Sequence, residues 1–218
     1  MKIGAIITGD IIDSTALVAE QRELMLAALR ELPAVLSAVD SNVSLEIFRG
    51  DSFQLHISDT PMALRAAVAI RAWLRSQILN PNGMVLDARL AIGVGKIDFE
   101  SSSLATSDGE AFRLSGRLLD EMTKSRLEIR TMWEPVNDQL KVATAFADDI
   151  ISSWTASQSK IILRSLLTGG SHRDVAGSMG VSRQMVTKSL KSSKEELISN
   201  YIVWFEKLIT DYFNKELL

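Results

Sequence analysis

Two acidic residues near the start of the sequence follow short apolar runs and could hold a divalent cation. Asp10 comes after the isoleucine-rich run at 2–8, and Asp51 lies in an Arg-Gly-Asp-Ser turn between two alternating runs. If the first strand lies beside that hairpin, both carboxylates meet at one end of the sheet, where they repel each other unless a cation lies between them. Carboxylate oxygens suit Mg²⁺, with substrate phosphates completing the shell, and Asp13 is an extra candidate ligand. The alternative is that these acids are ordinary turn residues.

A second chemical signal is a basic segment near the other end of the chain. Between Thr155 and Lys194 there are seven Lys or Arg residues and one Asp, a net charge of +6, although the whole chain carries −3. A local excess of positive charge is what binding to a phosphate backbone requires. The alternative is an ordinary solvated face.

Within this basic segment, three small or polar residues have the spacing of a helix-turn-helix. Ala176 lets two helices approach, Gly180 can take the positive φ of a tight turn, and Ser182 can cap the second helix. On that helix, Met185 and Val186 are expected to face inward. The alternative is a helix pair with a chance glycine turn. The side chains expected to contact DNA, through base edges or phosphates, are those of Ser182, Arg183, Gln184, Thr187, Lys188 and Lys191.

The elements that position the two acids are predicted to form an α+β unit. Helical and alternating spacing of apolar residues predicts the order strand, helix, hairpin, helix, strand, helix, strand, helix. Its βαββαβ core is ferredoxin-like, with an antiparallel-containing sheet and helices on one face. The predicted strands are 2–8, 43–48, 53–57, 85–94 and 126–132, and the predicted helices are 16–39, 60–79, 111–124 and 136–154.

The C-terminal segment has no strand signal and is predicted to be all-α. We place the boundary near 153–155, which gives a ferredoxin-like domain at 1–153 and a helix-turn-helix domain at 154–218. A long helix predicted from residue 195 to the end carries a wide apolar stripe that needs a partner. Either the N-terminal domain or a second subunit covers this stripe, and a two-fold dimer would suit DNA binding.

Composition excludes several classes of protein. The 218 residues include no Cys and two His, which excludes disulfide scaffolds, thiolate zinc sites, iron–sulfur clusters, cysteine nucleophiles and histidine-rich metal sites. The chain is 46% apolar and 23% charged, which is an ordinary globular balance. It has no apolar run of the roughly eighteen residues that a membrane span needs, and its first residues lack a signal-peptide cleavage pattern. We therefore expect a cytoplasmic protein.

Four short motifs occur within about residues 1–130. They are TGDIIDST with Asp10, GDSF with Asp51, RLAIGVG at 89–95 and GEAFRLSGRL at 109–118. In this order and at this spacing they resemble class III nucleotidyl cyclases and, more closely, the SatD family of cyclase-related bacterial proteins. The resemblance implies a cyclase- or palm-like form of the ferredoxin-like fold. It also implies a homodimer, because active sites of the cyclase family form between two subunits.

The resemblance assigns roles to individual residues. In the cyclase family two motif aspartates hold two metal ions at a substrate triphosphate, and these positions match Asp10 and Asp51. The backbone at Ile11 would be a further metal ligand, and Mg²⁺ or Mn²⁺ the cofactor. Arg117 matches the arginine that stabilises the transition state, so the catalytic residues implied are Asp10, Asp51 and Arg117.

Two positions depart from the cyclase pattern. Arg113 stands where the family has an asparagine, and Ile47 stands where it has a base-reading lysine. These departures count against purine cyclisation. The part of the implied function that these departures leave is metal and phosphate binding by Asp10, Asp51 and Arg117, with Arg113 as an added phosphate contact.

Three functions compete on these grounds. The first, which we favour, is a DNA-binding transcriptional regulator that binds double-stranded DNA and whose cyclase-like domain senses a nucleotide or only dimerises. The second is a Mg²⁺- or Mn²⁺-dependent nucleotidyl cyclase, in degenerate form, or a related nucleotidyl transferase. The third is a structural interaction module whose acidic turns are only turns.

Overall fold

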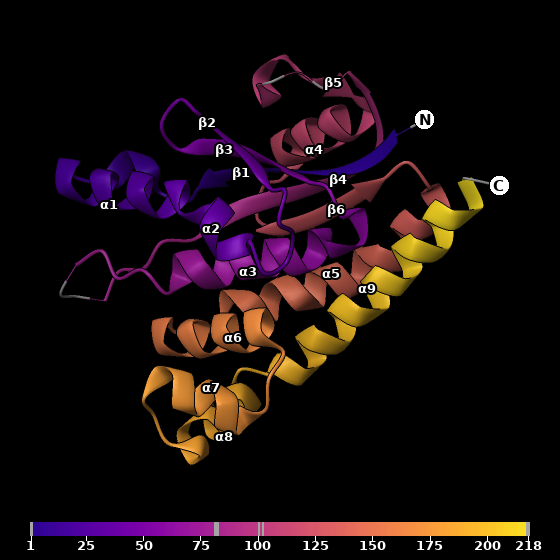
Figure 1. The fold of residues 1–218 in the computed structure, drawn as a ribbon. Helices are drawn as coiled ribbons and strands as arrows, with labels where there is room; N and C mark the ends of the chain where they lie inside the picture. Colours follow the sequence, from indigo (N-terminus) through magenta and orange to yellow (C-terminus); the bar gives the residue numbers. More distant parts are fainter. Residues whose placement is uncertain (1, 81–82, 100, 102, 217–218) are drawn as a thin grey trace.

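The computed structural model describes residues 2–80, 83–99, 101 and 103–216, and these residues form a mixed α+β fold (Figure 1). Six strands of the described chain form one sheet with the order β2-β3-β1-β4-β5, and β6 pairs with β4. Paired strands run antiparallel, except that β6 runs parallel to β4. The strands are β1 (Lys2–Ile11), β2 (Ser44–Phe48), β3 (Ser52–Ile57), β4 (Ala88–Phe99), β5 (Asp108–Gly109) and β6 (Leu127–Thr131).

The helices follow the predicted order along the chain. They are α1 (Ala19–Arg30), α2 (Leu32–Leu36), α3 (Ala63–Arg75), α4 (Glu110–Glu121), α5 (Glu134–Ser152), α6 (Ala156–Thr168), α7 (His172–Met179), α8 (Arg183–Ser192) and α9 (Glu195–Glu216), with 3-10 turns at Ser14–Ala16, Thr60–Met62 and Leu104–Thr106. The helix predicted at 16–39 is therefore two helices. Pro33 lies in the first turn of α2, where its missing N–H has no helical partner to lose. Across the ranges described, no helix has both the length and the apolar character needed to cross a bilayer.

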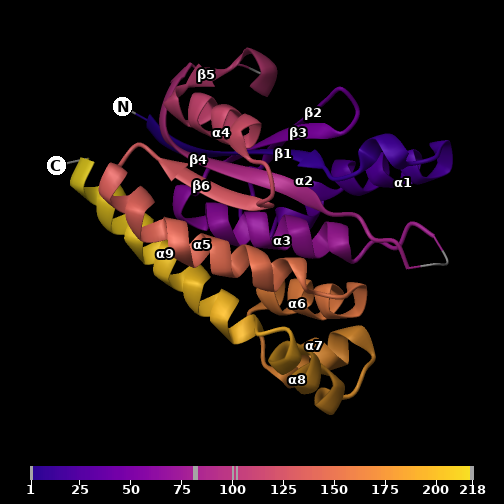
Figure 2. The same ribbon diagram turned by 180° about the vertical axis from the view of Figure 1, so that it is seen from behind.

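Helices cover both faces of the sheet, so the expectation of helices on one face is wrong. In both views α4 lies on one side of the sheet, and α3 and α5 lie on the other (Figures 1 and 2). A Cβ atom at Gly93 would lie 2.3 Å from the carbonyl oxygen of Ala111, so only glycine lets α4 approach β4 this closely. Along the middle of β4, residues 90–95, both alternate sets of side chains are apolar or small, the pattern of a strand buried on two faces. Leu90, Ile92 and Val94 enter the main core, whereas Ala91 packs with α4.

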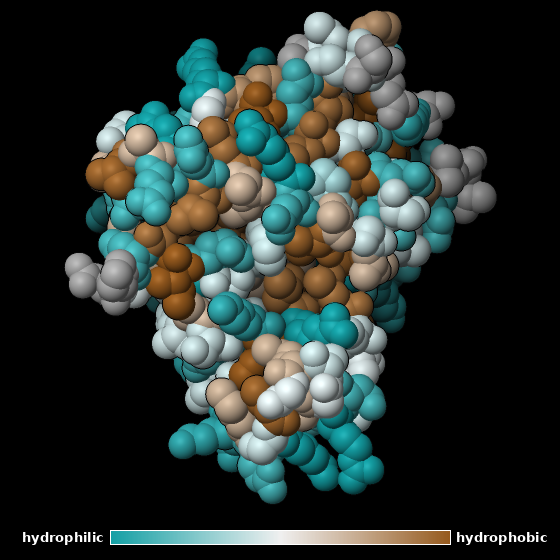
Figure 3. All heavy atoms as spheres, turned by 60° about the vertical axis from the view of Figure 1, so that its left-hand side comes forward, coloured by the Kyte–Doolittle hydropathy of each residue, from teal (hydrophilic) through white to brown (hydrophobic). Residues whose placement is uncertain are grey.

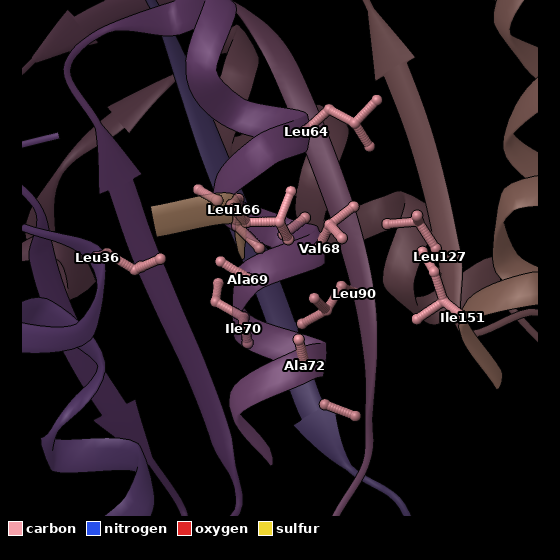
Figure 4. Close-up of a cluster of buried hydrophobic side chains, with 14 of the residues drawn as sticks. Leu36, Leu64, Val68, Ala69, Ile70, Ala72, Leu90, Leu127, Ile151 and Leu166 are labelled. Atoms are coloured by element: carbon pink, nitrogen blue, oxygen red, sulfur yellow. The ribbon is translucent and has the colours of Figure 1, made fainter. Parts of the chain in front are cut away.

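The C-terminal helices share the main core with the N-terminal unit. Figure 4 shows Leu166 of α6 and Ile151 of α5 in one cluster with α3, β4 and β6. Of the two partners left open for the C-terminal helix, the structure shows the N-terminal unit. Helix α9 lies alongside α5 in both views (Figures 1 and 2), and Glu206 of α9 pairs with Arg65 in the first turn of α3 at 2.7 Å. The side chains that α9 buries are Ile198, Ile202, Phe205 and Ile209. Residues 217 and 218 of the predicted helix lie outside the described residues.

Buried ion pairs join α3 to α5 and to Asp87, the residue just before β4. Arg71 has no exposed surface; its Nη2 lies 2.8 Å from Oδ2 of Asp87, and its Nη1 lies 2.6 Å from Oδ1 of Asp148. Arg75 also pairs with Asp87 at 2.7 Å and donates to the carbonyl oxygen of Trp154 at 2.6 Å. Burial alone would raise the pKa of Asp87, but the hydrogen bonds and charge of Arg71 outweigh burial and hold that pKa below its ordinary value.

Candidate functional site

The structure brings the two acidic segments to one end of the sheet. Strand β1 lies between β3 and β4, so Asp10 is directly opposite Ser52 on one side and Arg89 on the other. Asp51 precedes Ser52 in the hairpin turn, and its carbonyl oxygen accepts a 3.1 Å hydrogen bond from the backbone N–H of Ile11. The end of β1 and the β2–β3 turn are therefore adjacent, as the predicted strand arrangement requires.

The carboxylate of Asp10 is bound by Arg89, a basic residue that the sequence analysis did not single out. Nε of Arg89 donates to Oδ1 of Asp10 at 3.0 Å, and its Nη2 donates to Oδ2. Its third nitrogen, Nη1, donates to the carbonyl oxygen of Met122 at 2.8 Å. The hydrogen bonds that Arg89 donates to Asp10 raise the pKa of Arg89, which keeps its guanidinium charged. Strand register was the signal that could have found Arg89, because β1 and β4 pair residue by residue.

The carboxylate of Asp51 has an internal partner as well. Oδ2 of Asp51 accepts a hydrogen bond from the buried hydroxyl of Ser14 at 2.6 Å. Asp13, the extra candidate ligand, is exposed and adopts a left-handed conformation with φ 57° at the start of a 3-10 turn. Ser14 thus ties the segment after β1 to the hairpin turn.

The carboxylate oxygens of Asp10 and Asp51, with the hydrogen bonds that they accept, do not suit a divalent cation. Both oxygens of Asp10 accept from a guanidinium, and one oxygen of Asp51 accepts from a hydroxyl. Within the described ranges no cluster of three or more His, Cys, Asp or Glu residues could hold a metal ion. Mg²⁺ needs oxygen ligands whose lone pairs are free. The expectation of Mg²⁺ or Mn²⁺ at Asp10, Ile11 and Asp51 therefore has no support from this arrangement, in which Arg89 supplies the positive charge.

The two arginines of α4 lie apart from the acidic turns. Arg113 is exposed, and its pairs with Asp98 at 3.1 Å and Asp108 at 2.7 Å occupy its guanidinium. Arg117 lines a cavity of about 490 Å³, whose lining includes neither Asp10 nor Asp51. Within one chain, the arginines predicted to bind phosphate and the acids predicted to bind metal thus belong to different places.

The cavity beside α4 is rich in charge of both signs. Its cations come from α4, β4 and β6, and are Lys96, Arg113, Arg117 and Arg130. Its acids are Asp98, Glu110 and Glu121. Arg130 pairs with Glu121 at 2.7 Å and Arg113 pairs with Asp98, so part of the positive charge is already neutralised.

A tight turn joins α7 and α8 as the sequence predicts. Gly180 ends α7 with φ 66°, a left-handed conformation that favours glycine. The side chain of Ser182 caps α8 by accepting from the backbone N–H of Met185 at 3.2 Å. Val186 is buried, but Met185 is 50% exposed, so the expectation that both face inward is wrong for Met185. Met185 lies in the first turn of α8, whose buried side is formed by Val186 and Leu190.

The side chains expected to contact DNA all lie on the exposed side of this turn and α8. Helices α7 and α8 form a lobe at one end of the molecule, far from the sheet (Figures 1 and 2). Thr187 contacts His172 at the start of α7, with 3.0 Å between Oγ1 and Nδ1. The exposed residues are Ser182, Arg183, Gln184, Thr187, Lys188 and Lys191.

No protein-family model matches the chain, and no curated protein matches it. Solved structures that resemble it include the non-canonical dimeric guanylyl cyclase domain of the RhoGC fusion protein from the aquatic fungus Blastocladiella emersonii, with TM-score 0.46 and 16% identity over 56% of this chain and 76% of that chain. The guanylyl cyclase Cya2 has TM-score 0.45 and 18% identity over 56% and 71%. A bacterial light-regulated adenylyl cyclase has TM-score 0.42 and 19% identity over 58% and 74%.

These three structural neighbours are guanylyl and adenylyl cyclases, the class of protein that the sequence motifs resemble. None of the three is described as a DNA-binding protein.

Proposed function

We propose that this chain binds double-stranded DNA through α8. The observation that carries the proposal is the exposed basic face of α8, which starts at a glycine turn and protrudes from the end of the molecule. Val186 and Leu190 are buried against α6 and α7 and hold the helix in place. A helix presented in this way can enter the major groove, which is wide enough to admit it.

The residue types along α8 suit the two kinds of DNA contact. Arg183 and Gln184 lie in its first turn, where a recognition helix reads base edges through bidentate hydrogen bonds. Lys188 and Lys191 lie further along the exposed face, where ammonium groups bind phosphates and set the salt dependence. A transcriptional regulator is the class of protein that this arrangement suits.

Salt-dependent binding by the full chain tests the DNA proposal. Fluorescence anisotropy with a random-sequence duplex, at about 50 mM and 200 mM salt, is expected to show affinity falling steeply with salt as counterions are released. The variant Arg183→Glu/Lys188→Glu should lose binding, whereas Lys207→Glu, which changes an exposed lysine on α9, should keep it. Salt-independent or absent binding by the unmodified chain would overturn the proposal.

The proposal includes a homodimer, because two α8 helices related by a two-fold axis read the half-sites of a palindromic operator. Light scattering of the full chain should then report twice the 24.0 kDa mass of one chain. If the chain is a monomer and still binds DNA, the proposal keeps recognition of a single site, and the proposed homodimer is wrong.

Nucleotide binding is a second candidate function, as in a nucleotidyl cyclase or a related nucleotidyl transferase. The observation that favours it is the cavity of about 490 Å³ beside α4, where Lys96, Arg117 and Arg130 come together. Guanidinium groups form strong, directional hydrogen bonds with phosphate oxygens. This candidate function involves phosphate contacts alone, because Arg89 binds the carboxylate of Asp10, which would otherwise hold a metal.

Calorimetric titration with ATP and GTP, together with chromatography of the products, tests this second candidate. Binding is expected to be lost in Arg117→Ala and kept in Lys124→Ala, an exposed residue outside the cavity lining. Formation of a cyclic nucleotide would support the cyclase reading. If neither nucleotide binds, the cavity is an ordinary charged surface.

A further inference from the structure

A groove of about 680 Å³ lies where the N-terminal unit meets the C-terminal helices, and neither function proposed above uses it. We call it the interunit groove. One wall comes from α2 and the end of α3, and the other from α6 and the end of α7. Figure 3 brings this side of the molecule forward and shows apolar side chains gathered in a hollow above the lobe of α7 and α8. Its large apolar side chains are Val35, Trp73, Leu163, Leu167 and Met179.

The apolar wall is built from half-buried side chains on ordered helices. Leu163 and Leu167 are four residues apart on α6 and so lie on one helical face. Trp73 of α3 is anchored, because its Nε1 donates to the carbonyl oxygen of Ala28 at 2.9 Å. Ala34 and Ala38 at the end of α2 contribute small side chains, which leave the groove open. Water in contact with this wall is released when an apolar ligand covers it.

One edge of the interunit groove is positively charged. Lys160 and Arg164 line it from α6, one turn apart, and both are exposed. Nε of Arg164 donates to Oγ of Ser178 at 2.9 Å, which holds the guanidinium beside α7. Among the residues that the structure describes, no Asp or Glu lines this groove. Its charge is therefore complementary to an anion.

We propose that the interunit groove binds a small amphiphile with an apolar body and one anionic head group, such as a medium-chain carboxylate. The apolar body covers Trp73, Leu163 and Leu167, and the head group pairs with Lys160 and Arg164. The cavity volume is within the roughly 300–1,000 Å³ of small-molecule sites. Binding of this ligand does not depend on whether α8 binds DNA.

Fluorine NMR of the full chain labelled with 5-fluorotryptophan tests the proposal. The chain has four Trp residues, and Trp73→Phe identifies the resonance of Trp73. Decanoate below its micelle concentration should shift that resonance in a saturable way and leave the other three nearly unchanged. Decyltrimethylammonium has the same apolar body with the opposite charge and should bind at least about tenfold more weakly, because the head group then faces two cations.

Two variants separate the apolar and charged parts of the site. Ala38→Trp fills the groove from an exposed position and should abolish the shift. Lys160→Glu/Arg164→Glu should weaken decanoate binding about tenfold or more, whereas Lys207→Glu on α9 should leave it unchanged. Equal binding of both amphiphiles, or an unshifted Trp73 resonance with decanoate, would overturn the proposal. Binding that survives Ala38→Trp would place the ligand elsewhere and would also overturn it.

Discussion

Asp10 and Arg89 face each other across β1 and β4, and their pairing changes how the acidic end of the sheet is understood. A guanidinium presents a planar fork of N–H donors that matches a carboxylate. Here two of its nitrogens bind both oxygens of Asp10, and the third binds the backbone at Met122. The repulsion between Asp10 and Asp51 that a cation would relieve is therefore relieved within the protein.

Removing the side chain of Arg89 should allow a divalent metal ion to bind at Asp10 and Asp51. Arg89→Leu frees both oxygens of Asp10 beside Asp51, and we expect Mn²⁺ to bind this variant roughly tenfold or more tightly than the unmodified chain, each tenfold step being about 1.4 kcal/mol. Electron paramagnetic resonance measures free Mn²⁺ during a titration. The gain should disappear in Arg89→Leu/Asp10→Asn. Tight Mn²⁺ binding by the unmodified chain that Asp10→Asn removes would show instead that Arg89 yields to the metal.

At the scale of elements, two glycines at α4 and its contact with β4 have opposite surroundings. At Gly93 in β4, an added Cβ would lie 2.3 Å from the carbonyl oxygen of Ala111 and 2.6 Å from the backbone nitrogen of Ser115. At Gly116 in the middle of α4, it would meet no atom within 4 Å. The first glycine is required by packing, and the second only weakens the helix.

Alanine substitutions at these glycines should therefore have opposite effects on stability. Gly93→Ala forces backbone apart and should destabilise the fold by about 1–3 kcal/mol. Gly116→Ala should stabilise it by about 0.5–1 kcal/mol, because alanine loses less conformational entropy in a helix. Urea unfolding followed by circular dichroism measures both. A neutral Gly93→Ala would mean that α4 does not pack on β4 at this distance.

Helix α8 illustrates how a short turn determines an exposed surface. Gly180 and Ser182 set where α8 begins, and Val186 and Leu190 determine which side faces α6 and α7. The other positions of α8 are exposed to solvent or lie at the edge of this contact. An apolar residue among them, Met185, is exposed for this geometric reason although its type alone suggested burial.

At the scale of the whole molecule, the buried arginine–aspartate network links α3 to α5 within the predicted domain at 1–153 and reaches Trp154, the first residue of the predicted domain at 154–218. Asp87 binds Arg71 and Arg75 of α3, and Arg71 also binds Asp148 of α5. The partners are buried, so losing one of them leaves a charge without compensation. The apolar cluster, which includes Leu166 of α6 and Phe205 of α9, spans the predicted boundary and couples the C-terminal helices to the sheet.

The network should make stability depend on pH in the acid range. The folded-state pKa of Asp87 lies below its unfolded value of 3.8, so its stabilisation is complete above that value and is lost as the pH falls through the folded pKa. Asp87→Asn should lower the unfolding free energy at neutral pH by about 3–5 kcal/mol, because Arg71 and Arg75 stay buried and lose the carboxylate that they share. Its stability should also change less than that of the unmodified chain as the pH falls from neutral to below 3.8, because the variant lacks the carboxylate whose pKa is lowered.

Urea unfolding at several pH values measures this effect, with Asp138→Asn as the matched control at an exposed position. The control should follow the unmodified chain. An Asp87→Asn variant with unchanged stability at neutral pH would contradict the assigned role of the network.

The sequence by itself determined most elements and their order, because their signals are local. The hairpin at Asp51, the left-handed Gly180 and the cap at Ser182 each depend on residues a few positions apart. The prediction that the first strand lies beside the hairpin was enough to place Asp10 near the turn that carries Asp51.

Only the tertiary structure decided what those residues contact. Arg89 and Asp10 are 79 positions apart, and Arg71 and Asp148 are 77 positions apart. Such pairs depend on strand register and on how helices pack, neither of which leaves a periodic trace in the sequence. The same holds for the face that α4 covers and for the interunit groove, because each is formed by surfaces that meet only after the chain has folded.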